Sequence, residues 1–202
     1  LFADNRLVFP RGGEGKPRYK LFLSEKKKEG QLANTWLDEL ASNQVATKEI
    51  KELFEEQVVF DTPKPVGLLS FCIELASGEN DIILDFFSGS STTAHAIIKC
   101  NAEDGGNRRC IMVTNNEISV DEEKEFTKRG IKKGDDEWES HGIAQFVTWP
   151  RTVCSINGVD INGNALKGNY LGSDKPMADG FRANVKFFKC DWTPRKPEDY
   201  LL

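Results

Sequence analysis

A run of small polar residues carries the side chains best suited to hold a ligand in this chain of 202 residues. The run extends from Asp85 to Thr93 and reads Asp-Phe-Phe-Ser-Gly-Ser-Ser-Thr-Thr. It follows an apolar strand candidate, Ile82 to Leu84, and leads into a helical pattern from Ala94 to Ile98. Backbone N–H groups and hydroxyls converge where a parallel strand ends and a helix begins, so the run predicts a ligand-binding loop.

The loop does not have the composition that phosphate ligands require. The chain contains no Gly-Lys-Ser or Gly-Lys-Thr of a Walker loop, and the single Gly89 does not make a dinucleotide Gly-x-Gly-x-x-Gly motif. S-adenosylmethionine makes different demands, because it has an ammonium, a carboxylate and a ribose but no phosphate. Asp85 is placed to meet the ammonium, Ser90 to Thr93 the carboxylate, and Glu117 the ribose hydroxyls. Turn and helix-cap roles for the same residues remain an open alternative.

The predicted elements bring these residues to one edge of a sheet. The strand before Asp85, the helix after Ser91 and a second strand from Cys110 to Thr114 form a βαβ unit. Parallel pairing with a right-handed crossover is the expected arrangement of such a unit. Ser119 to Glu122 has capping-box spacing, which predicts a further helix.

Elements outside this unit are less regular in pattern. Ile50, Leu53 and Phe54 predict a short amphipathic helix, and Pro65 is expected in the first turn of the next one. The first forty residues predict loops with short strands. Three further expectations concern the carboxy-terminal part: a helix from 143 to 156 interrupted at Pro150, an exposed loop or hairpin over 157–180, and a third sheet strand over 185–190.

Composition indicates a soluble protein of the cytoplasm. Hydrophobic residues make up 39% and charged residues 29%, and no apolar run is long enough to cross a membrane. Five cysteines without a Cys-x-x-Cys pair argue against a disulfide framework and a zinc site. The amino terminus lacks signal-peptide features and is expected to be a cut inside a longer chain. Residues 1–30 hold eight basic against four acidic residues, which suggests a surface that faces DNA.

Three segments resemble one family when they are taken in order. The loop resembles the Asp-x-Phe-x-Gly-Ser-Gly-Thr-Thr cofactor motif of β-class DNA amino-methyltransferases. Asp61 to Leu69 resembles the helix motif that precedes it in that class, where the methionine end of the cofactor is also contacted. The turn from Glu103 to Arg109, with the strand and Glu117 after it, looks like the modification (Mod) subunit of type III restriction-modification systems.

The resemblance implies a partial Rossmann-like α/β fold for S-adenosylmethionine, with parallel strands and flanking helices. It implies a linker or DNA-facing segment at 1–57 and a cofactor-binding part at 58–202. The partners implied are DNA, a restriction (Res) subunit and a second modification subunit, with no membrane. The cofactor-binding residues that it implies are Asp85, Phe87, Gly89, Ser90, Thr92, Thr93, Glu117, Lys64 and Pro65.

The chain departs from the family pattern at two places. Ser91 stands where the family usually has a second glycine, which is expected to move the loop from the cofactor or to add a hydroxyl contact. No Asp-Pro-Pro-Tyr or close variant occurs, so no residue is assigned a catalytic role. The resemblance therefore implies the carboxy-terminal portion of an adenine-N6 methyltransferase that is inactive by itself.

Other functions and other roles of single residues stay open at this point. A DNA-binding or subunit-assembly module with a vestigial cofactor loop is the main alternative function. A hydrolase or dehydrogenase fragment is disfavoured because the chain lacks a Gly-x-Ser-x-Gly elbow and a glycine-rich dinucleotide loop. Phe87 is expected near the cofactor or, equally, as a core aromatic beneath the loop. His95 is expected to be a packing or surface residue rather than a base.

Overall fold

The computed structural model divides the chain into two compact units, Leu1–Leu37 and Asp38–Leu202. The residues that the structure describes are 4–13, 15–29, 32–33, 36–37, 42–170 and 174–190.

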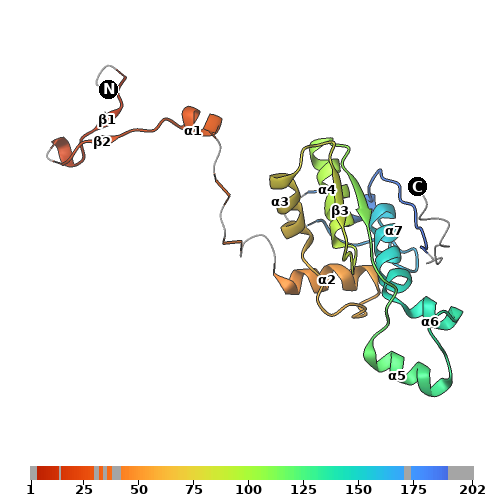
Figure 1. Ribbon diagram of the computed structural model, residues 1–202. Helices are drawn as coiled ribbons and strands as arrows, with labels where there is room; N and C mark the ends of the chain where they lie inside the picture. Colours follow the sequence, from red (N-terminus) through yellow and green to blue (C-terminus); the bar gives the residue numbers. More distant parts are fainter. Residues whose placement is uncertain are drawn as a thin grey trace, which may run out of the picture. The chain divides into compact units, whose positions relative to one another are not determined.

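The first unit is built around one small antiparallel pair. Strand β1 (Leu7–Val8) pairs with β2 (Arg18–Tyr19), with the 3₁₀ turn η1 (Arg11–Gly13) between them and helix α1 (Leu23–Glu29) after them (Figure 1). The Arg6 guanidinium donates to both carboxylate oxygens of Glu25 and lies over the Phe22 ring. These contacts join the residue before β1 to α1. The β1–β2 pair confirms the prediction of short strands in this region, and α1 is a helix that the sequence did not predict.

The second unit alternates helices with two parallel strands (Figure 1). Its elements in chain order are α2 (Asn43–Leu53), α3 (Val66–Ala76), β3 (Ile82–Asp85), α4 (Thr92–Asp104), β4 (Arg109–Met112), α5 (Val120–Arg129), α6 (Asp136–His141), the π-helix η2 (Ala144–Thr148), α7 (Trp149–Asn157) and the 3₁₀ turn η3 (Met177–Asp179). Among the described residues, every helix is too short or too polar to span a bilayer.

The predicted βαβ unit is present as β3, α4 and β4. The two strands are parallel, with Ile82 opposite Arg109 and Asp85 opposite Met112. Alternation along β3 turns Ile83 and Asp85 toward the more buried face, and Ile83 packs against the core cluster of α3 and α4. The strands therefore end together at Asp85 and Met112, and the polar loop leaves the sheet at that edge.

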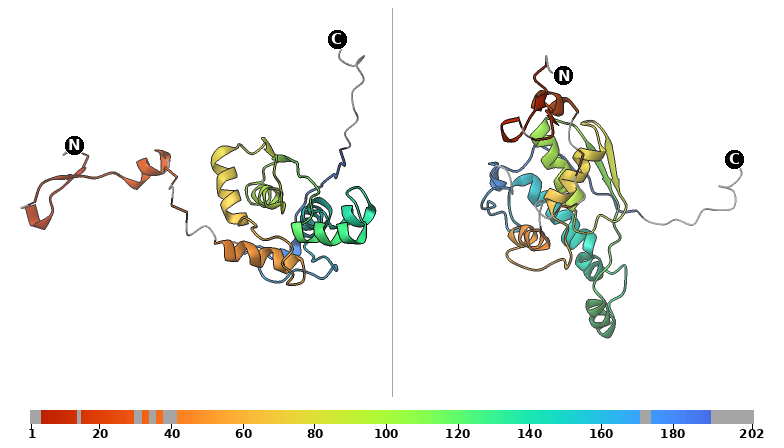
Figure 2. Two further views of the ribbon diagram at one scale, coloured as in Figure 1. Left: turned by 60° about the horizontal axis from the view of Figure 1, so that its bottom comes forward. Right: turned by 90° about the vertical axis from the view of Figure 1, so that its left-hand side faces the viewer.

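Helix α4 lies between α3 and α7, which pack on different sides of it (Figure 2). Val66 and Ile73 of α3 meet Ala96, Ile97 and Cys100 of α4 in one core cluster. A second cluster joins α2, α7 and the segment that follows α7. Its buried members are Ile50, Leu53, Phe54, Val147, Cys154, Leu166, Tyr170, Met177 and Phe181.

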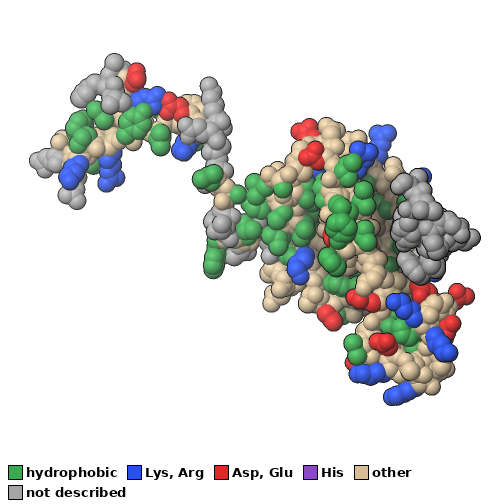
Figure 3. All heavy atoms as spheres, in the orientation of Figure 1, with side chains coloured by type: hydrophobic (Ala, Val, Ile, Leu, Met, Phe, Trp, Pro, Cys, Tyr) green, Lys and Arg blue, Asp and Glu red, His purple; other side chains and the backbone are tan. Residues whose placement is uncertain are grey.

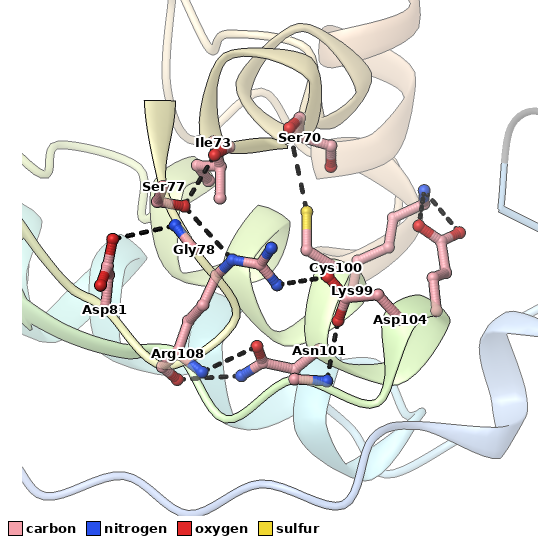
Figure 4. Close-up of polar contacts among 12 residues, drawn as sticks. Ser70, Ile73, Ser77, Gly78, Asp81, Lys99, Cys100, Asn101, Asp104 and Arg108 are labelled. Atoms are coloured by element: carbon pink, nitrogen blue, oxygen red, sulfur yellow. Dashed lines mark hydrogen bonds and ion pairs between the residues drawn. The ribbon is translucent and has the colours of Figure 1, made fainter. Parts of the chain in front are cut away.

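A buried arginine ties the far ends of α3 and α4 to the start of β4 (Figure 4). The Arg108 guanidinium donates from Nε to Ser77 Oγ at 3.2 Å and from Nη1 to Asp104 Oδ2 at 2.6 Å. The Asn101 side chain bonds both the N–H and the carbonyl of Arg108. Asp81 accepts the Gly78 N–H nearby, so the turns at this end of the sheet are held by side chains. Arg108 is thus a structural residue whose charge is paired.

Three sequence expectations for the carboxy-terminal part need correction. Pro150 does not interrupt a helix, because it lies in the first turn of α7, where the missing N–H is tolerated, and a π-helix precedes it. Residues 157–180 do not form only an exposed loop, since Leu166, Tyr170 and Met177 belong to the core. The segment also contains two isolated bridges, Val159 with Ala165 and Asn169 with Pro176.

The predicted strand over 185–190 is absent. These residues have no regular structure, and the described part of the sheet contains β3 and β4 alone. Phe187 packs against the Trp149 ring instead. A strand needs a neighbour for its backbone groups, and an apolar pattern cannot supply one.

The boundary between the two compact units lies between Leu37 and Asp38, whereas the division into a DNA-facing segment at 1–57 and a cofactor-binding part at 58–202 concerns function and stays a prediction. Helix α2 belongs to the second unit, where Ile50 and Leu53 are buried against α7. The physical reason is the apolar stripe on α2, which requires a core to cover it.

Candidate functional site

The loop after β3 is organised around the carboxylate of Asp85. Its Oδ1 atom accepts the N–H of Phe87 at 3.0 Å, and its Oδ2 atom accepts the hydroxyl of Thr93 at 2.5 Å. Ser88 N–H donates to the carbonyl of Val113, just beyond β4, at 3.0 Å. Asp85 therefore closes the loop between the end of β3 and the first turn of α4.

Two residues of the loop adopt left-handed backbone conformations. Gly89 has φ +48°, and a Cβ there would approach Cζ of Phe60 to 3.2 Å, so both the conformation and the space favour glycine. Ser91 has φ 66° and is fully buried. Its hydroxyl lies 2.5 Å from Thr152 Oγ1, so it is directed toward α7 and does not supply the expected contact with a cofactor. The tight bend into α4 thus requires the conformation that a second glycine would adopt freely.

One face of α7 and its preceding π-turn holds this loop. We call it the α7 polar face, and it consists of Thr148, Arg151 and Thr152, which contact the loop, and Ser155, which contacts His95 instead. Thr148 Oγ1 donates to Gly89 O at 2.5 Å, and Arg151 Nη1 donates to Ser90 O at 3.1 Å. The spacing i, i+3, i+4 aligns these side chains along one helix surface. Two consecutive backbone carbonyls of the loop, those of Gly89 and Ser90, therefore accept hydrogen bonds from this face.

Arg151 is the buried charge at the centre of this face. Its Nη1 atom also lies 3.0 Å from Ser90 Oγ and 2.8 Å from Thr92 Oγ1. Its Nε and Nη2 atoms have no hydrogen-bond partner among the described residues. Burial lowers the pKa of Arg151 to about 10, although the charge of Glu49 acts in the opposite direction. Burial in turn raises the pKa of Glu49, whose carboxylate accepts the Val66 N–H at 3.3 Å.

His95 lies one turn into α4 and is a buried residue with two polar partners. Its Nε2 atom is 3.1 Å from Tyr170 Oη, and its Nδ1 atom is 3.3 Å from Ser155 Oγ. Burial, together with the charges of Arg151 and Lys99, lowers the pKa of His95 well below its usual value. The prediction that His95 is a packing residue rather than a base is in agreement with this environment.

Glu117 leaves the same edge of the sheet as Asp85, five residues after the end of β4. Its exposed carboxylate accepts the Asn115 side-chain amide at 2.7 Å. Its carbonyl accepts the Ile143 N–H at 2.8 Å. The neighbouring Asn116 accepts the N–H groups of Ala144 and Gln145, at 3.0 and 3.2 Å, which fixes this turn to the π-helix.

The other predicted residues lie around the loop in different degrees of exposure. Phe87 is 93% exposed, so it is not the core aromatic that the sequence equally allowed. Pro65 is buried at the N-cap of α3, just before the expected first turn, and Lys64 is exposed with Nζ 3.3 Å from Thr62 O. Phe60 joins this segment to the loop through its approach to Gly89.

The polar contacts thus bring together only some of the predicted residues. Asp85 bonds Thr93, and Ser90 Oγ lies 3.2 Å from Thr92 Oγ1. The Glu117 carboxylate bonds Asn115 of its own turn. An open hollow of about 610 Å³ lies beside Thr93, between α3 and β3, and Glu117 is not among its lining residues. Cofactor binding by the nine predicted residues therefore stays a prediction.

The α7 polar face was missed in the sequence. Its signal is present, because Thr148, Arg151, Thr152 and Ser155 recur at i, i+3, i+4 and i+7 in a segment expected to be helical. A polar stripe is ordinarily a solvated face, and only the fold shows that this one is buried against the loop.

Comparisons with known proteins agree with the motifs in the loop. A family model described as DNA methylase, of the N6 and N4 methyltransferases, matches residues 10–134. The StyLTI Mod subunit of a type III restriction-modification enzyme from Salmonella typhimurium is 44% identical over 114 residues, covering 56% of this chain and 17% of that protein. The type II methyltransferase M.KpnI from Klebsiella pneumoniae is 38% identical over 93 residues, covering 46% of this chain and 22% of that protein.

A third relative is, like the first, a Mod subunit of a type III restriction-modification enzyme. The EcoPI Mod subunit of a type III restriction-modification enzyme from Escherichia phage P1 is 35% identical over 83 residues, 41% of this chain and 13% of that protein. The chain thus spans less than a quarter of the length of each of these curated relatives. Because the family model covers more than half of the chain, the chain belongs to the DNA methylase family of N6 and N4 methyltransferases.

Proposed function

We propose that this chain is the cofactor-binding part of a DNA adenine-N6 methyltransferase, the Mod subunit of a type III restriction-modification system, with S-adenosylmethionine as its cofactor. The observation that carries the proposal is the loop from Asp85 to Thr93, held at the carboxyl edge of a parallel strand pair. Ligands of open α/β sheets bind at this edge. Membership of the DNA methylase family supports the same cofactor.

Each predicted residue has a role in this proposal. Asp85 meets the ammonium of the methionine moiety through the loop, and the N-terminus of α4, with Ser90, Thr92 and Thr93, faces its carboxylate. Glu117 accepts the ribose hydroxyls. Phe87, 93% exposed beside the loop, packs on the adenine or on the methionine end. Gly89, Lys64 and Pro65 shape the wall between the loop and α3.

The Rossmann-like sheet of the proposed fold extends beyond the two strands described. Ile82, Leu84, Ile111 and Val113 are exposed on β3, β4 and just beyond it, and Figure 3 shows hydrophobic side chains gathered over β3. The helices lie to one side of these strands (Figure 2). A soluble protein covers such a face, and we propose that the remainder of the methyltransferase domain covers it.

The methyl transfer itself needs groups that this sequence does not contain. The family reaction moves a methyl group from the sulfonium to the exocyclic amine of an adenine flipped out of the duplex. The Asp-Pro-Pro-Tyr segment that holds the flipped base is missing from the 202 residues, so we propose that the chain alone binds cofactor without transferring methyl groups. DNA, a Res subunit and a second Mod subunit are the proposed partners of the whole enzyme.

We also propose a cytoplasmic location. All five cysteines are free, as a reducing compartment allows.

Isothermal titration with S-adenosylmethionine tests the proposal on the full 202-residue chain. We expect saturable binding, weakened about 10-fold or more in Asp85→Asn, because a charge-assisted hydrogen bond is lost. Asp81→Asn is the matched control, since Asp81 lies at the opposite end of β3, where it accepts the Gly78 N–H at 2.9 Å. It should bind the cofactor like the unaltered chain.

Two results would count against the proposal. An unaltered chain that releases no heat with the cofactor lacks the proposed site. If such a chain nevertheless shifts DNA in a gel, with affinity that falls steeply as salt rises, the alternative of a DNA-binding module with a vestigial loop is favoured. Equal weakening in the Asp81 and Asp85 variants would indicate loss of fold rather than loss of a ligand contact.

A further inference from the structure

Two buried arginines in the second unit differ in how their charges are satisfied. Arg108 is paired with Asp104 at 2.6 Å and bonds Ser77, so its role in joining α3, α4 and β4 explains it fully (Figure 4). Arg151 is fully buried and bonds the neutral oxygens of Ser90 and Thr92 through Nη1 alone. Its Nε and Nη2 atoms lack partners among the described residues.

A buried guanidinium in this state works against stability. Unsatisfied buried donors and an unpaired charge each lower the free energy of unfolding, and an apolar side chain of similar volume is often neutral or better in such a place. The Glu49 carboxylate acts on this charge without a hydrogen bond to it, since Nε and Nη2 have no partner among the described residues and Glu49 accepts the Val66 N–H. A purely structural role therefore does not explain Arg151, whereas an anionic ligand nearby would.

The contacts of Arg151 point to where that anion binds. Arginine has no acceptor, so Ser90 Oγ and Thr92 Oγ1 must accept from it. The two hydroxyls lie 3.2 Å apart, so one of them donates its proton to the other in a hydrogen bond. The proton of the second hydroxyl is then left to donate to a further acceptor. The first-turn N–H groups of α4, a helix of 13 residues, are directed toward the same end.

We propose that Arg151 is a positioning residue for the carboxylate of the cofactor's amino-acid tail. It fixes Ser90 and Thr92 as hydroxyl donors and adds a positive charge to the N-terminus of α4. It acts through the loop and its charge, since Arg151 itself is fully buried and Ser90 and Thr92, which it bonds, are only 4% and 5% exposed. The inference rests on the proposed function, because it names how that same site holds one end of the cofactor.

A pair of ligands that differ in the tail tests the proposal. S-adenosylhomocysteine carries the amino-acid tail, and 5′-methylthioadenosine has the same nucleoside without it. In Arg151→Met we expect binding of S-adenosylhomocysteine to weaken by about 10-fold or more, while 5′-methylthioadenosine binds within about twofold of the unaltered chain. Arg151→Lys should restore part of the loss, because it retains the charge. Thermal unfolding of Arg151→Met should occur at the same or a higher temperature.

Ser155→Ala is the matched control on the same helix face. Ser155 is also fully buried, but its hydroxyl contacts His95 instead of the loop. This variant should be less stable and should bind both ligands like the unaltered chain. Thr92→Val removes one contact of Arg151 without changing the charge, and its smaller, tail-specific loss of affinity tests the proposal should Arg151→Met not fold.

The outcomes separate this inference from the proposed function. A chain that binds neither nucleoside overturns the proposed function and the role of Arg151 with it. A chain that binds both, with Arg151→Met retaining full affinity or losing affinity equally for both ligands, overturns the role of Arg151 and leaves the proposed function standing.

Discussion

Ser91 holds a backbone conformation that side chains other than glycine rarely adopt. Its φ of 66° lies in the left-handed region, at the bend between the loop and α4. The buried hydroxyl contact with Thr152, at 2.5 Å, compensates for part of the resulting strain. Compared with the glycine that the family usually has here, Ser91 is more strained in this conformation but gains a hydrogen bond to Thr152.

We expect Ser91→Gly to be more stable than Ser91→Ala by about 1–2 kcal/mol, because both lose the hydroxyl and only alanine retains the left-handed strain. This order is the reverse of the usual one, because a protein with glycine inside a helix or strand is ordinarily less stable than the same protein with alanine there. Urea unfolding of the two variants measures the difference. If alanine were the more stable, the strain assigned to this bend would be absent.

Helices α4 and α7 meet through polar side chains as well as apolar ones. His95 of α4 bonds Ser155 of α7 and Tyr170 of the following segment. Burial lowers the pKa of His95, so this junction contains a neutral imidazole. The unfolded chain takes up a proton at this histidine as the pH falls below about 6.5, whereas the folded chain does so only at lower pH.

The stability that depends on a neutral His95 is therefore fully present above pH about 6.5 and is lost as the pH falls below that value, by at most about 1.4 kcal/mol per pH unit. We expect the free energy of unfolding to fall by about 1 kcal/mol more in the unaltered chain than in His95→Gln between pH 7.5 and 5.5. Urea unfolding at the two pH values measures it. Equal losses in both proteins would show that His95 is not held neutral by the fold.

At the scale of the whole second unit, the parallel pair has one covered and one bare face. Ile83 packs on the core shared by α3 and α4, whereas Ile111 is 54% exposed on the neighbouring strand. Exposed apolar side chains over both strands make the surface that we propose the remainder of a methyltransferase domain covers (Figure 3). The loop from Asp85 to Thr93 is thus fully formed in this unit, although one face of the strand pair before it is exposed.

We expect Ile111→Lys to leave the free energy of unfolding within about 1 kcal/mol of the original value, since its side chain lies on the bare face. It should also lower self-association, as measured by sedimentation velocity, and the binding of a hydrophobic dye. Ile83→Lys is the control on the covered face, and it should unfold the unit or destabilise it by several kcal/mol because it buries a charge. Similar effects of the two substitutions would mean that the bare face is covered in solution.

The sequence by itself determined several local elements and the family to which the chain belongs. The apolar run before Asp85, the helix after Ser91 and the capping box at Ser119 are local patterns, and all three are present as expected. The three motifs taken in order were sufficient to identify the family, because each is contiguous in the chain and their order is informative. Local geometry can be predicted where neighbours in the chain are also neighbours in space.

Only the tertiary structure decided which distant side chains hold the loop. Arg151 lies about sixty positions from Ser90, and nothing in the local pattern distinguishes its buried polar face from a solvated one. The same limit explains the wrong strand over 185–190, since strand formation depends on a partner elsewhere in the chain. Burial and pairing are properties of the packed chain, so the loop's residues were found in the sequence and its support was found only in the fold.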